Sequence, residues 1–453
     1  MISKSDYMLF LKHPAWLWVK KNDPKKIPPV DENTRAMFDA GHQFEPYAES
    51  LFPEGVSLGF SDYDEYRSLP QRTQDAIERG DKVLFQPRFG WQDFTCICDI
   101  VSFVGENEVD LYEIKASTRA KPEHEYDLAF QAAVLEGYGL KMRNISVIHV
   151  NNQYVRHEEI KADEITAFTD ITEVVRNKGE TTQNHMAQAL SVAKSPTMPD
   201  PNPDLVKFGY KKDWLPIYQN IVGMTEEPQQ ENIEPTINKP AIKQFLDELK
   251  YPLYFLDYET MSSLIPYFDG HKPYQQVPFQ YSLHILASPD AELIQKEYLH
   301  RDNSDPSRPL TEQLIKDIGT EGSIIVWYEG FEKSRNSELG EMLPEYKDVM
   351  EAINARVVDL MIPFQQKWYD DPRFNGSASI KQVLPVVCPH LSYKELGIQE
   401  GGSAQRLWME AILDGKRDNE KAKILDDLVE YCKLDTLAMV EVYNCLRKLW
   451  IFI

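Results

Sequence analysis

Residues 94–117, FTCICDIVSFVGENEVDLYEIKAS, decide the fold of the N-terminal half of this 453-residue chain. Two apolar runs, CICDIVSFV and VDLYEIKA, flank the turn-forming residues GENE, and this pattern predicts a β-hairpin. Asp99 interrupts the first run, which is otherwise apolar. Alternate residues of a strand face the same way, so Glu113 and Lys115 share one face of the second strand. We therefore expect Asp99 to converge with Glu113 and Lys115.

These three residue types suit a metal site that hydrolyses phosphodiester bonds. The carboxylates of Asp99 and Glu113 can hold Mg²⁺ or Mn²⁺ through hard oxygen ligands. Lys115 can orient or deprotonate a water and offset charge on a phosphate. The alternative is a surface hairpin with one Glu–Lys pair, because a D…ExK pattern is common by itself.

Two predicted helices flank this hairpin. The helix over residues 123–138 carries Gln131 and Tyr138 on one face, because they are 7 residues apart. An earlier helix over residues 32–51 carries His42 and Glu45. With these elements, region 36–155 resembles the RecB-like branch of the PD-(D/E)XK nucleases, which includes CRISPR-associated exonucleases.

The resemblance assigns a role to each of these side chains. It implies that Asp99 and Glu113 are metal ligands and that Lys115 is the catalytic lysine. It also implies that other helical residues help to position the DNA or complete the site, namely Gln131, Tyr138 and either His42 or Glu45.

Many nucleases of this group carry an iron–sulfur cluster on four cysteines, the first in a Cys-Pro dipeptide. Here the corresponding dipeptide is His13-Pro14, and residues 180–225 contain no cysteine. Thiolates are the required ligands of such clusters, so we expect no iron–sulfur cluster. The 5 cysteines of the chain are too scattered for a disulfide framework or a zinc ribbon. This usage favours a reducing, cytoplasmic compartment.

The C-terminal half has its own acidic pattern, in the stretch YFLDYET at residues 254–260. A strand here would place Asp257 and Glu259 on one face. The stretches VPFQYSLHILA and LIQKEYLH follow and predict a β-meander with it. A strand SIIVWY and a long last helix over residues 419–449 complete a second mixture of helices and strands. Both halves are therefore expected to be mixed α/β.

Two carboxylates on a buried strand need a compensating charge, because buried unpaired charge is costly. A pair of divalent metal ions would supply it, and could stabilise both the attacking and the leaving oxygen of a phosphodiester. A third acid is Glu332, just after SIIVWY, with Asp359 in RVVDLM as its rival. The fourth is Asp435 in the last helix, where Tyr431 lies one turn earlier on the same face.

This order of acids resembles the DEDD family of 3′–5′ exonucleases, tyrosine subclass, on an RNase H-like fold. The resemblance covers about residues 250–445. It implies that Asp257, Glu259, Glu332 and Asp435 are metal ligands and that Tyr431 holds the attacking water. A RecB-like nuclease followed by an RNase H-like exonuclease resembles an uncharacterised bacterial protein family with that fusion.

The expected organisation is a PD-(D/E)XK nuclease-like domain at 1–195, a Pro-rich linker at 196–240 and an RNase H-like domain at 241–453. The chain has 49 basic and 72 acidic residues, a net charge of −23, which argues against holding nucleic acid by bulk electrostatics. No apolar run approaches the ~18 residues of a membrane span, so no membrane association is expected.

The leading hypothesis is a cytoplasmic, Mg²⁺- or Mn²⁺-dependent nuclease with two active sites. The first would cut DNA, and the second would trim 3′ ends of DNA or RNA. The alternative is a nucleic-acid-binding or partner-binding protein in which one or both sites are inactive. The negative net charge favours this alternative slightly.

Overall fold

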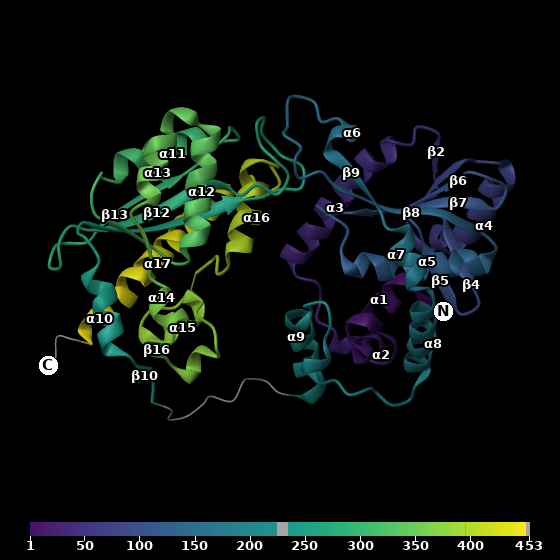
Figure 1. The fold of residues 1–453 in the computed structure, drawn as a ribbon, viewed down its shortest axis with the longest axis horizontal. Helices are drawn as coiled ribbons and strands as arrows, with labels where there is room; N and C mark the ends of the chain where they lie inside the picture. Colours follow the sequence, from purple (N-terminus) through teal and green to yellow (C-terminus); the bar gives the residue numbers. More distant parts are fainter. Residues whose placement is uncertain (224–233, 395, 450–453) are drawn as a thin grey trace. The chain divides into compact units, whose positions relative to one another are not determined.

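The computed structural model describes residues 1–223, 234–394 and 396–449, and the chain divides into two compact units, Met1–Glu227 and Pro228–Ile453 (Figure 1). Each unit combines helices with mixed β-sheet, as the sequence predicts.

The first unit is built around a six-stranded sheet in the order β2-β3-β6-β7-β8-β9, with a smaller sheet β1-β5-β4 beside it. Its strands are β1 (Ile2–Ser3), β2 (Gly55–Ser57), β3 (Val83–Phe85), β4 (Arg88–Trp91), β5 (Phe94–Ile97), β6 (Ile100–Phe103), β7 (Glu108–Lys115), β8 (Lys141–Val150) and β9 (Thr166–Asp170). Its α-helices are α1 (Lys4–Lys12), α2 (Pro14–Asn22), α3 (Glu32–Ser50), α4 (Tyr63–Arg79), α5 (Pro122–Tyr138), α6 (Ala162–Ile165), α7 (Thr172–Asn177), α8 (Gly179–Lys194) and α9 (Lys211–Val222).

The hairpin predicted from residues 94–117 is confirmed for its second strand, β7, and for the later part of its first strand, β6. β6 pairs with β7 in antiparallel register, and the turn between them spans the GENE residues. The first apolar run is not one strand, because it breaks at Cys98 and Asp99 and its two parts, β5 and β6, join different sheets. The carboxylate of Asp99 accepts the backbone N–H of Ile114 at 2.7 Å, just beyond the last β6–β7 pair. The break therefore frees Asp99 to satisfy a backbone donor of β7.

Helices cover both faces of the six-stranded sheet. α5 connects β7 to β8, which run parallel, and it packs with Leu111 of β7 and Val147 of β8 in one apolar cluster. On the other face, Ala48 of α3 packs in a cluster with Tyr112 and Ile114. Because side chains alternate along β7, Glu113 lies on the face of α5. The hairpin thus presents its charged residues to α5.

The predicted linker needs a correction, because much of it is packed structure. Trp214 and Ile217 of α9 pack against Ala15 and Val19 of α2, and Trp214 is fully buried. The prolines at 196–203 interrupt regular structure, but they do not prevent the following helix from burying an apolar face. The first unit therefore extends beyond residue 195. Residues 224–233 of the predicted linker lie outside the described residues.

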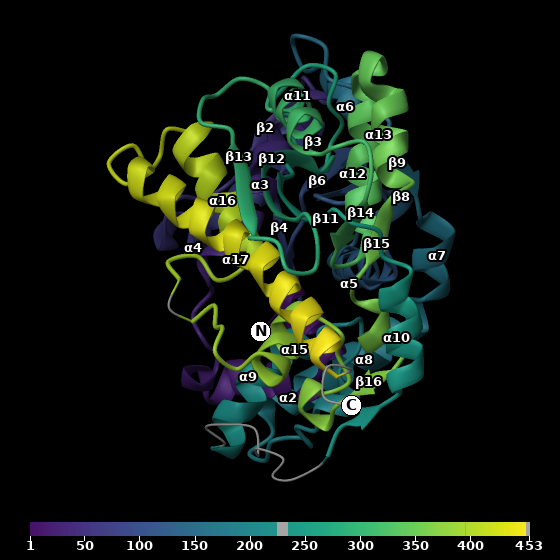
Figure 2. The same cartoon turned by 90° about the vertical axis from the view of Figure 1, so that its left-hand side faces the viewer.

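The second unit is built around a five-stranded sheet in the order β13-β12-β11-β14-β15 (Figures 1 and 2). Its strands are β10 (Thr236–Ile237), β11 (Leu253–Met261), β12 (Val277–Leu286), β13 (Ile294–Leu299), β14 (Ser323–Val326), β15 (Val357–Asp359) and β16 (Tyr369–Asp370). Its α-helices are α10 (Lys239–Asp247), α11 (Ser307–Asp317), α12 (Glu329–Met342), α13 (Lys347–Asn354), α14 (Ile362–Gln365), α15 (Ile380–Val387), α16 (Gly401–Ile412) and α17 (Lys421–Lys448).

The predicted β-meander is confirmed. β11, β12 and β13 are antiparallel neighbours, and β14 and β15 then extend the sheet in parallel from β11. Alternation along β11 separates two cores: Phe255 packs in the cluster that contains α17, whereas Tyr254 and Leu256 pack in the cluster that contains α11, α12 and α13. Asp257 lies two residues after Phe255 and therefore shares its face of β11, toward α17. The sheet itself directs the predicted acids toward the last helix.

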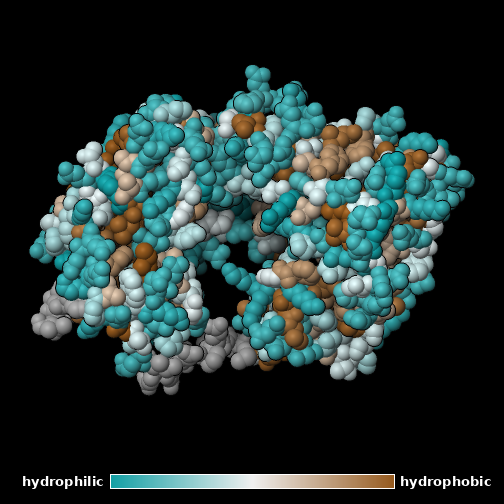
Figure 3. All heavy atoms as spheres, in the orientation of Figure 1, coloured by the Kyte–Doolittle hydropathy of each residue, from teal (hydrophilic) through white to brown (hydrophobic). Residues whose placement is uncertain are grey.

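The surface in Figure 3 is mostly hydrophilic, with scattered hydrophobic patches. In the described part of the chain, no helix combines the length and apolar character needed to span a membrane.

Candidate active sites

The first candidate site lies where β7 faces α5. Gln131 of α5 donates through Nε2 to Oε2 of Glu113 at 2.7 Å, and Lys115 donates through Nζ to Oε1 of Glu113 at 2.6 Å. Glu113 and Gln131 are both fully buried, so these contacts satisfy groups that water does not reach. The structure thus brings together the ExK strand and the glutamine helix.

Two residues that the sequence analysis did not single out complete this group. Asp127, one turn before Gln131 on α5, accepts from Lys115 at 2.8 Å and from Gln131 at 2.9 Å. Lys4, the first residue of α1, donates to Oε1 of Glu113 at 2.7 Å. The four-residue spacing to Gln131 is a sequence signal for Asp127, but no local pattern points to Lys4. We call this group the N-terminal cluster: Lys4, Asp99, Glu113, Lys115, Asp127 and Gln131.

Lysines dominate the electrostatics of this cluster. Burial by itself would raise the pKa of Glu113, but Lys115 and Lys4 outweigh it and hold that pKa well below its ordinary value. Burial would lower the pKa of Lys115, but the charges of Asp127 and Glu113 outweigh it and raise that pKa. Glu113 is therefore ionised and both of its oxygens are occupied by donors.

Asp99 is the acid of this cluster that is not neutralised by a direct ion pair among the described residues. Burial, followed by the charge of Glu113, raises the pKa of Asp99 to about 7, against the lowering effect of Lys4 and Lys115. A carboxyl group with such a pKa favours either a proton or a cation beside it. Asp99 and Glu113 would hold a metal ion here only in competition with the two lysines that already bind Glu113.

The structure places two predicted residues away from this cluster. Tyr138, at the end of α5, is partly exposed and its hydroxyl donates to Gln74 of α4. His42 of α3 is exposed and contacts Glu45, with 3.0 Å between Nδ1 and Oε1. Among the described residues, the hydrogen bonds of neither side chain reach Glu113. Seven residues of helix displace Tyr138 by about 10 Å from Gln131 along the same face, so Tyr138 contacts Gln74 instead of Glu113.

His13 occupies a structural position. It is buried, caps α2 by accepting the N–H of Ala15 at 3.0 Å, and stacks on Trp214 with 4.5 Å between ring centroids. Its Nε2 atom lies 3.1 Å from the carbonyl oxygen of Asn202. These contacts join α2 to the segment that follows α8, and the absence of an iron–sulfur cluster stays a prediction.

The second candidate site is an open pocket of about 300 Å³ in the second unit. Asp257 and Glu259 reach it from β11, and Tyr431 and Asp435 reach it from α17. Both elements are held in place by buried apolar residues of one core cluster, which includes Phe255 and Met439. The fold therefore brings together the predicted acids of the strand and of the last helix.

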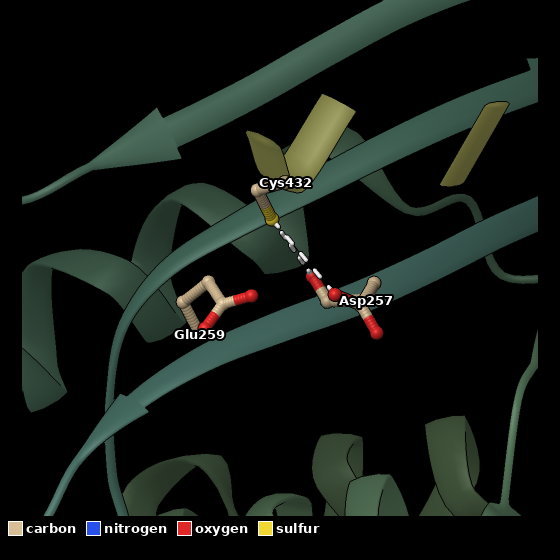
Figure 4. Close-up of side chains that lie close together, drawn as sticks. All are labelled: Asp257, Glu259 and Cys432. Atoms are coloured by element: carbon tan, nitrogen blue, oxygen red, sulfur yellow. Dashed lines mark hydrogen bonds between the residues drawn. The ribbon is translucent and has the colours of Figure 1, made fainter. Parts of the chain in front are cut away.

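Figure 4 shows Asp257 and Glu259 side by side on β11, with Cys432 of α17 pointing toward them. The thiol of Cys432 lies 4.0 Å from Oδ2 of Asp257, and ligand atoms of all three residues lie within 4.8 Å of one another. Burial, followed by the charges of Asp257 and Glu259, raises the pKa of the Cys432 thiol well above its ordinary value. A neutral thiol is a poor ligand for Mg²⁺, which prefers oxygen, so the carboxylates are the groups of this set that could hold such an ion.

The acids of this pocket repel one another. Burial, followed by the charges of Asp435 and Glu259, raises the pKa of Asp257 well above its ordinary value. Burial and Asp435 act on the pKa of Glu259 in the same direction. Burial also raises the pKa of Asp435 to about 6, although Tyr393 donates to its Oδ1 at 2.6 Å. Lys381 lowers the pKa values of these three acids but does not outweigh burial, so the balance of charge differs from that of the N-terminal cluster.

Glu332 and Asp359 are the two candidates for the third acid of the predicted metal site. Their environments differ. Asp359 accepts three backbone N–H groups, from Tyr328 at 3.0 Å, Glu329 at 3.1 Å and Met361 at 2.9 Å, so its carboxylate is fixed at the start of α12. Glu332, in the first turn of α12, is buried and its Oε2 has no hydrogen-bond partner among the described residues. Burial raises the pKa of Glu332 to about 8. The unsatisfied carboxylate favours Glu332 as a cation ligand.

The neighbouring residue Phe331 lines the pocket, and the charge of Glu332 contributes to the raised pKa of Asp257. Glu332 is therefore close enough to act on Asp257. We call the following four residues the C-terminal cluster: Asp257, Glu259, Glu332 and Asp435. An unsatisfied buried oxygen and raised carboxyl pKa values fit a site for divalent cations with oxygen ligands.

The sequence analysis missed two residues of this site: Lys381, which lines the pocket, and Tyr393, which contacts the pocket residue Asp435. Lys381 lies in the stretch SASIKQVLP at the start of α15 and lines the pocket. Tyr393 lies in the segment between α15 and α16 and bonds to Asp435. Neither residue has a spacing to the acids that a sequence pattern could reveal.

Comparison with known proteins finds a family model that matches part of the second unit. Residues 254–379 match the model of a family described as a domain of unknown function (DUF2779). This range begins within β11, ends just before α15, and contains Asp257, Glu259, Glu332 and Asp359.

Three curated relatives are uncharacterized proteins of bacteria without further functional description. The chain is similar to MG366 of Mycoplasma genitalium, at 26% identity over 227 residues, covering 46% of this chain and 34% of that protein. It is also similar to the MG366 homolog of Mycoplasma pneumoniae, at 26% identity over 230 residues, covering 44% and 33% respectively. UU173 of Ureaplasma parvum is 27% identical over 221 residues, covering 45% and 32%. The match spans about one third of the length of these relatives. No solved structure matches the chain.

Proposed function

We propose that the chain is a metal-dependent nuclease and that its C-terminal site trims 3′ ends of DNA or RNA. The observation that carries this proposal is the meeting of two distant segments at one pocket. Asp257 and Glu259 of β11 line it together with Tyr431 and Asp435 of α17. The three acids of the pocket, together with Glu332 beside its lining residue Phe331, would hold two divalent metal ions, which stabilise the attacking and the leaving oxygen of a phosphodiester.

The fold of the second unit supports an RNase H-like assignment. Its antiparallel meander, β11-β12-β13, continues into two parallel strands, and a long helix carrying an acid packs beside β11 and β12. Within this arrangement Asp257, Glu259, Glu332 and Asp435 would hold the metal ions. The hydroxyl of Tyr431 lines the pocket and would position the attacking water.

The N-terminal cluster supports a second nuclease site of PD-(D/E)XK type. Asp99 and Glu113 would hold one metal ion, and Lys115, already fixed by Asp127, would orient the water. One observation favours the alternative, in which this site binds nucleic acid or a partner without cleavage. Both oxygens of Glu113 are already occupied by Lys4, Lys115 and Gln131. We also propose a cytoplasmic location.

The test is digestion of end-labelled nucleic acid by the 453-residue chain. Single- and double-stranded DNA and RNA with a 5′ label are incubated with Mg²⁺, Mn²⁺ or EDTA. We expect a metal-dependent ladder of products shortened from the 3′ end. Asp435→Asn should abolish the ladder, because the amide carries no charge to hold a metal ion. Lys115→Ala in the Asp435→Asn background should remove any remaining cleavage.

Asp426→Asn is the matched control, because Asp426 is an exposed acid on the same helix as Asp435. This variant should cut like the wild type. An unchanged ladder with Asp435→Asn, or no metal-dependent cleavage of any substrate by the wild type, would contradict the proposed function.

A further inference from the structure

Lys381 is a cation in the acidic pocket that is not used in an ion pair. Its Nζ donates to the carbonyl oxygen of Gln399 at 2.7 Å and to the hydroxyl of Tyr431 at 3.4 Å. It also lies 5.5 Å from the ring centroids of both Tyr393 and Tyr431. Among the described residues, no carboxylate oxygen lies within the 4.0 Å that defines an ion pair with Lys381.

This arrangement fixes the ammonium group and leaves part of it available. An ammonium has three N–H donors, and the contacts with Gln399 and Tyr431 use two of them. The two tyrosine rings attract the cation without consuming a donor. Lys4 and Lys115 of the N-terminal cluster differ, because each binds a carboxylate within 2.7 Å. Lys381 therefore has a donor and a charge free for a ligand.

The charges of the pocket indicate what that ligand carries. Two divalent cations would neutralise the four carboxylates of the C-terminal cluster. The remaining positive charge of Lys381 then matches the single negative charge of one phosphodiester group. A phosphate bound between metal ions and a lysine is favoured over a neutral ligand in such a site.

We propose that Lys381 binds a non-bridging phosphate oxygen of the substrate at the C-terminal site, while its bond to Tyr431 orients that hydroxyl. This inference rests on the proposed two-metal nuclease function. It assigns a phosphate subsite to α15, an element outside the strand and helix that carry the acids Asp257, Glu259 and Asp435. The competing role for Lys381 is a purely structural one, in which it only ties Gln399 to Tyr431.

The experiment measures binding of Mn²⁺ alone, and then of thymidine 5′-monophosphate at saturating Mn²⁺, to the 453-residue chain by calorimetric titration. The variants are Lys381→Met, Lys381→Arg and the control Lys423→Met. Lys423 lies on α17 with an exposed side chain, so its replacement makes the same change of charge outside the pocket. Met keeps most of the length of the lysine side chain without its charge.

We expect Lys381→Met to bind Mn²⁺ like the wild type and to bind the nucleotide about 10–100-fold more weakly, the effect of one charge-assisted hydrogen bond. Lys381→Arg should restore most of the affinity, and Lys423→Met should match the wild type. Equal nucleotide affinity of Lys381→Met and wild type would overturn the inference while leaving the metal site intact. So would a wild type that binds Mn²⁺ but no nucleotide.

A Lys381→Met protein that loses Mn²⁺ and nucleotide together, without rescue by Lys381→Arg, would also overturn the inference, because it would indicate the structural role. Failure of the wild type to bind Mn²⁺ would overturn the proposed function and this inference with it. That outcome is recognised before any nucleotide is added, so the two failures are distinguishable.

Discussion

The two carboxylate clusters of this chain differ in how their buried negative charge is compensated. In the N-terminal cluster, Lys4 and Lys115 bind Glu113 directly and hold its pKa well below the ordinary value, although burial opposes them. In the C-terminal cluster, burial and mutual repulsion raise the pKa values of Asp257 and Glu259, and Lys381 stands outside ion-pair distance. In one cluster two lysines bind an acid directly, and in the other the one lysine of the described pocket lining forms no ion pair with the acids.

The difference indicates where an added cation would have the larger effect. A divalent ion at the C-terminal cluster would relieve repulsion between acids whose pKa values stay raised although Lys381 is near. At the N-terminal cluster the same ion must first displace an ammonium group from Glu113. The protein is therefore expected to respond to metal through its second unit before its first.

The largest expected effect is stabilisation of the second unit by Mn²⁺. A ligand that binds only the folded state at 100 times its dissociation constant adds about 2.7 kcal/mol to the free energy of unfolding. Asp257→Asn should abolish this gain, because it removes a ligand from the C-terminal cluster. Glu113→Gln should leave most of it unchanged. Thermal unfolding with and without Mn²⁺ measures both, and equal loss in the two variants would contradict the comparison.

Removal of Lys115 should have the next largest effect. Lys115→Ala removes one ammonium group from the surroundings of Asp127, whose remaining ammonium neighbour is Lys4 at 3.8 Å. Glu113 keeps its contacts with Lys4 and Gln131. Loss of this charged hydrogen-bond partner should lower the free energy of unfolding by about 1–3 kcal/mol. Urea unfolding checks this value. The variant should still fold, and an unchanged stability would show that Lys115 is not part of the buried network.

The pH dependence of the free energy of unfolding should also distinguish the C-terminal cluster from the N-terminal cluster. The pKa of Asp435 is raised to about 6 in the folded chain, so the folded state binds this proton more tightly than the unfolded state does. Without metal, its contribution to stability therefore falls as the pH rises from about 4 through 6. Asp435→Asn cannot ionise, so it should gain stability relative to the wild type between pH 5 and pH 7.5.

Urea unfolding of both proteins at the two pH values, in EDTA, measures this gain. Saturating Mn²⁺ should reverse the order at pH 7.5, because the metal binds the ionised wild type. A constant difference between the two proteins across this range would contradict a raised pKa for Asp435.

Local patterns predicted much of the fold. Alternation with intervening turns specified the meander β11-β12-β13, and the same alternation set Asp257 and Glu259 on one face. The break at Asp99 was not predictable, because the apolar run continues through it and only pairing with other strands splits the run between two sheets. The packing of α9 was not predictable from the sequence for a related reason. Its proline-rich surroundings indicate a linker, whereas Trp214 is buried by contacts with α2, far away in sequence.

The sites were predictable where a spacing carried the information. Glu113 with Lys115 on a strand is such a case, because a period of two fixes the shared face. Lys4 and Lys381 were not predictable, since each reaches its cluster from a helix with no sequence relation to the acids. His42 shows the converse, because its position on a helix did not reveal that its ring is exposed and contacts Glu45.

The smallest expected effects separate Glu332 from Asp359. Asp359 holds three backbone N–H groups at the start of α12, so Asp359→Asn should cost about 0.5–2 kcal/mol of stability, as for loss of a charged helix cap. It should leave the Mn²⁺ response intact. Glu332→Gln should do the opposite. In EDTA it should lose little stability, because the buried acid has a raised pKa and an unsatisfied oxygen. Its stabilisation by Mn²⁺ should be reduced. Unfolding of both variants in EDTA and in Mn²⁺ at pH 8 decides between them. If Asp359→Asn alone lost the response, Asp359 would be the ligand and α12 would be held at its start by other contacts.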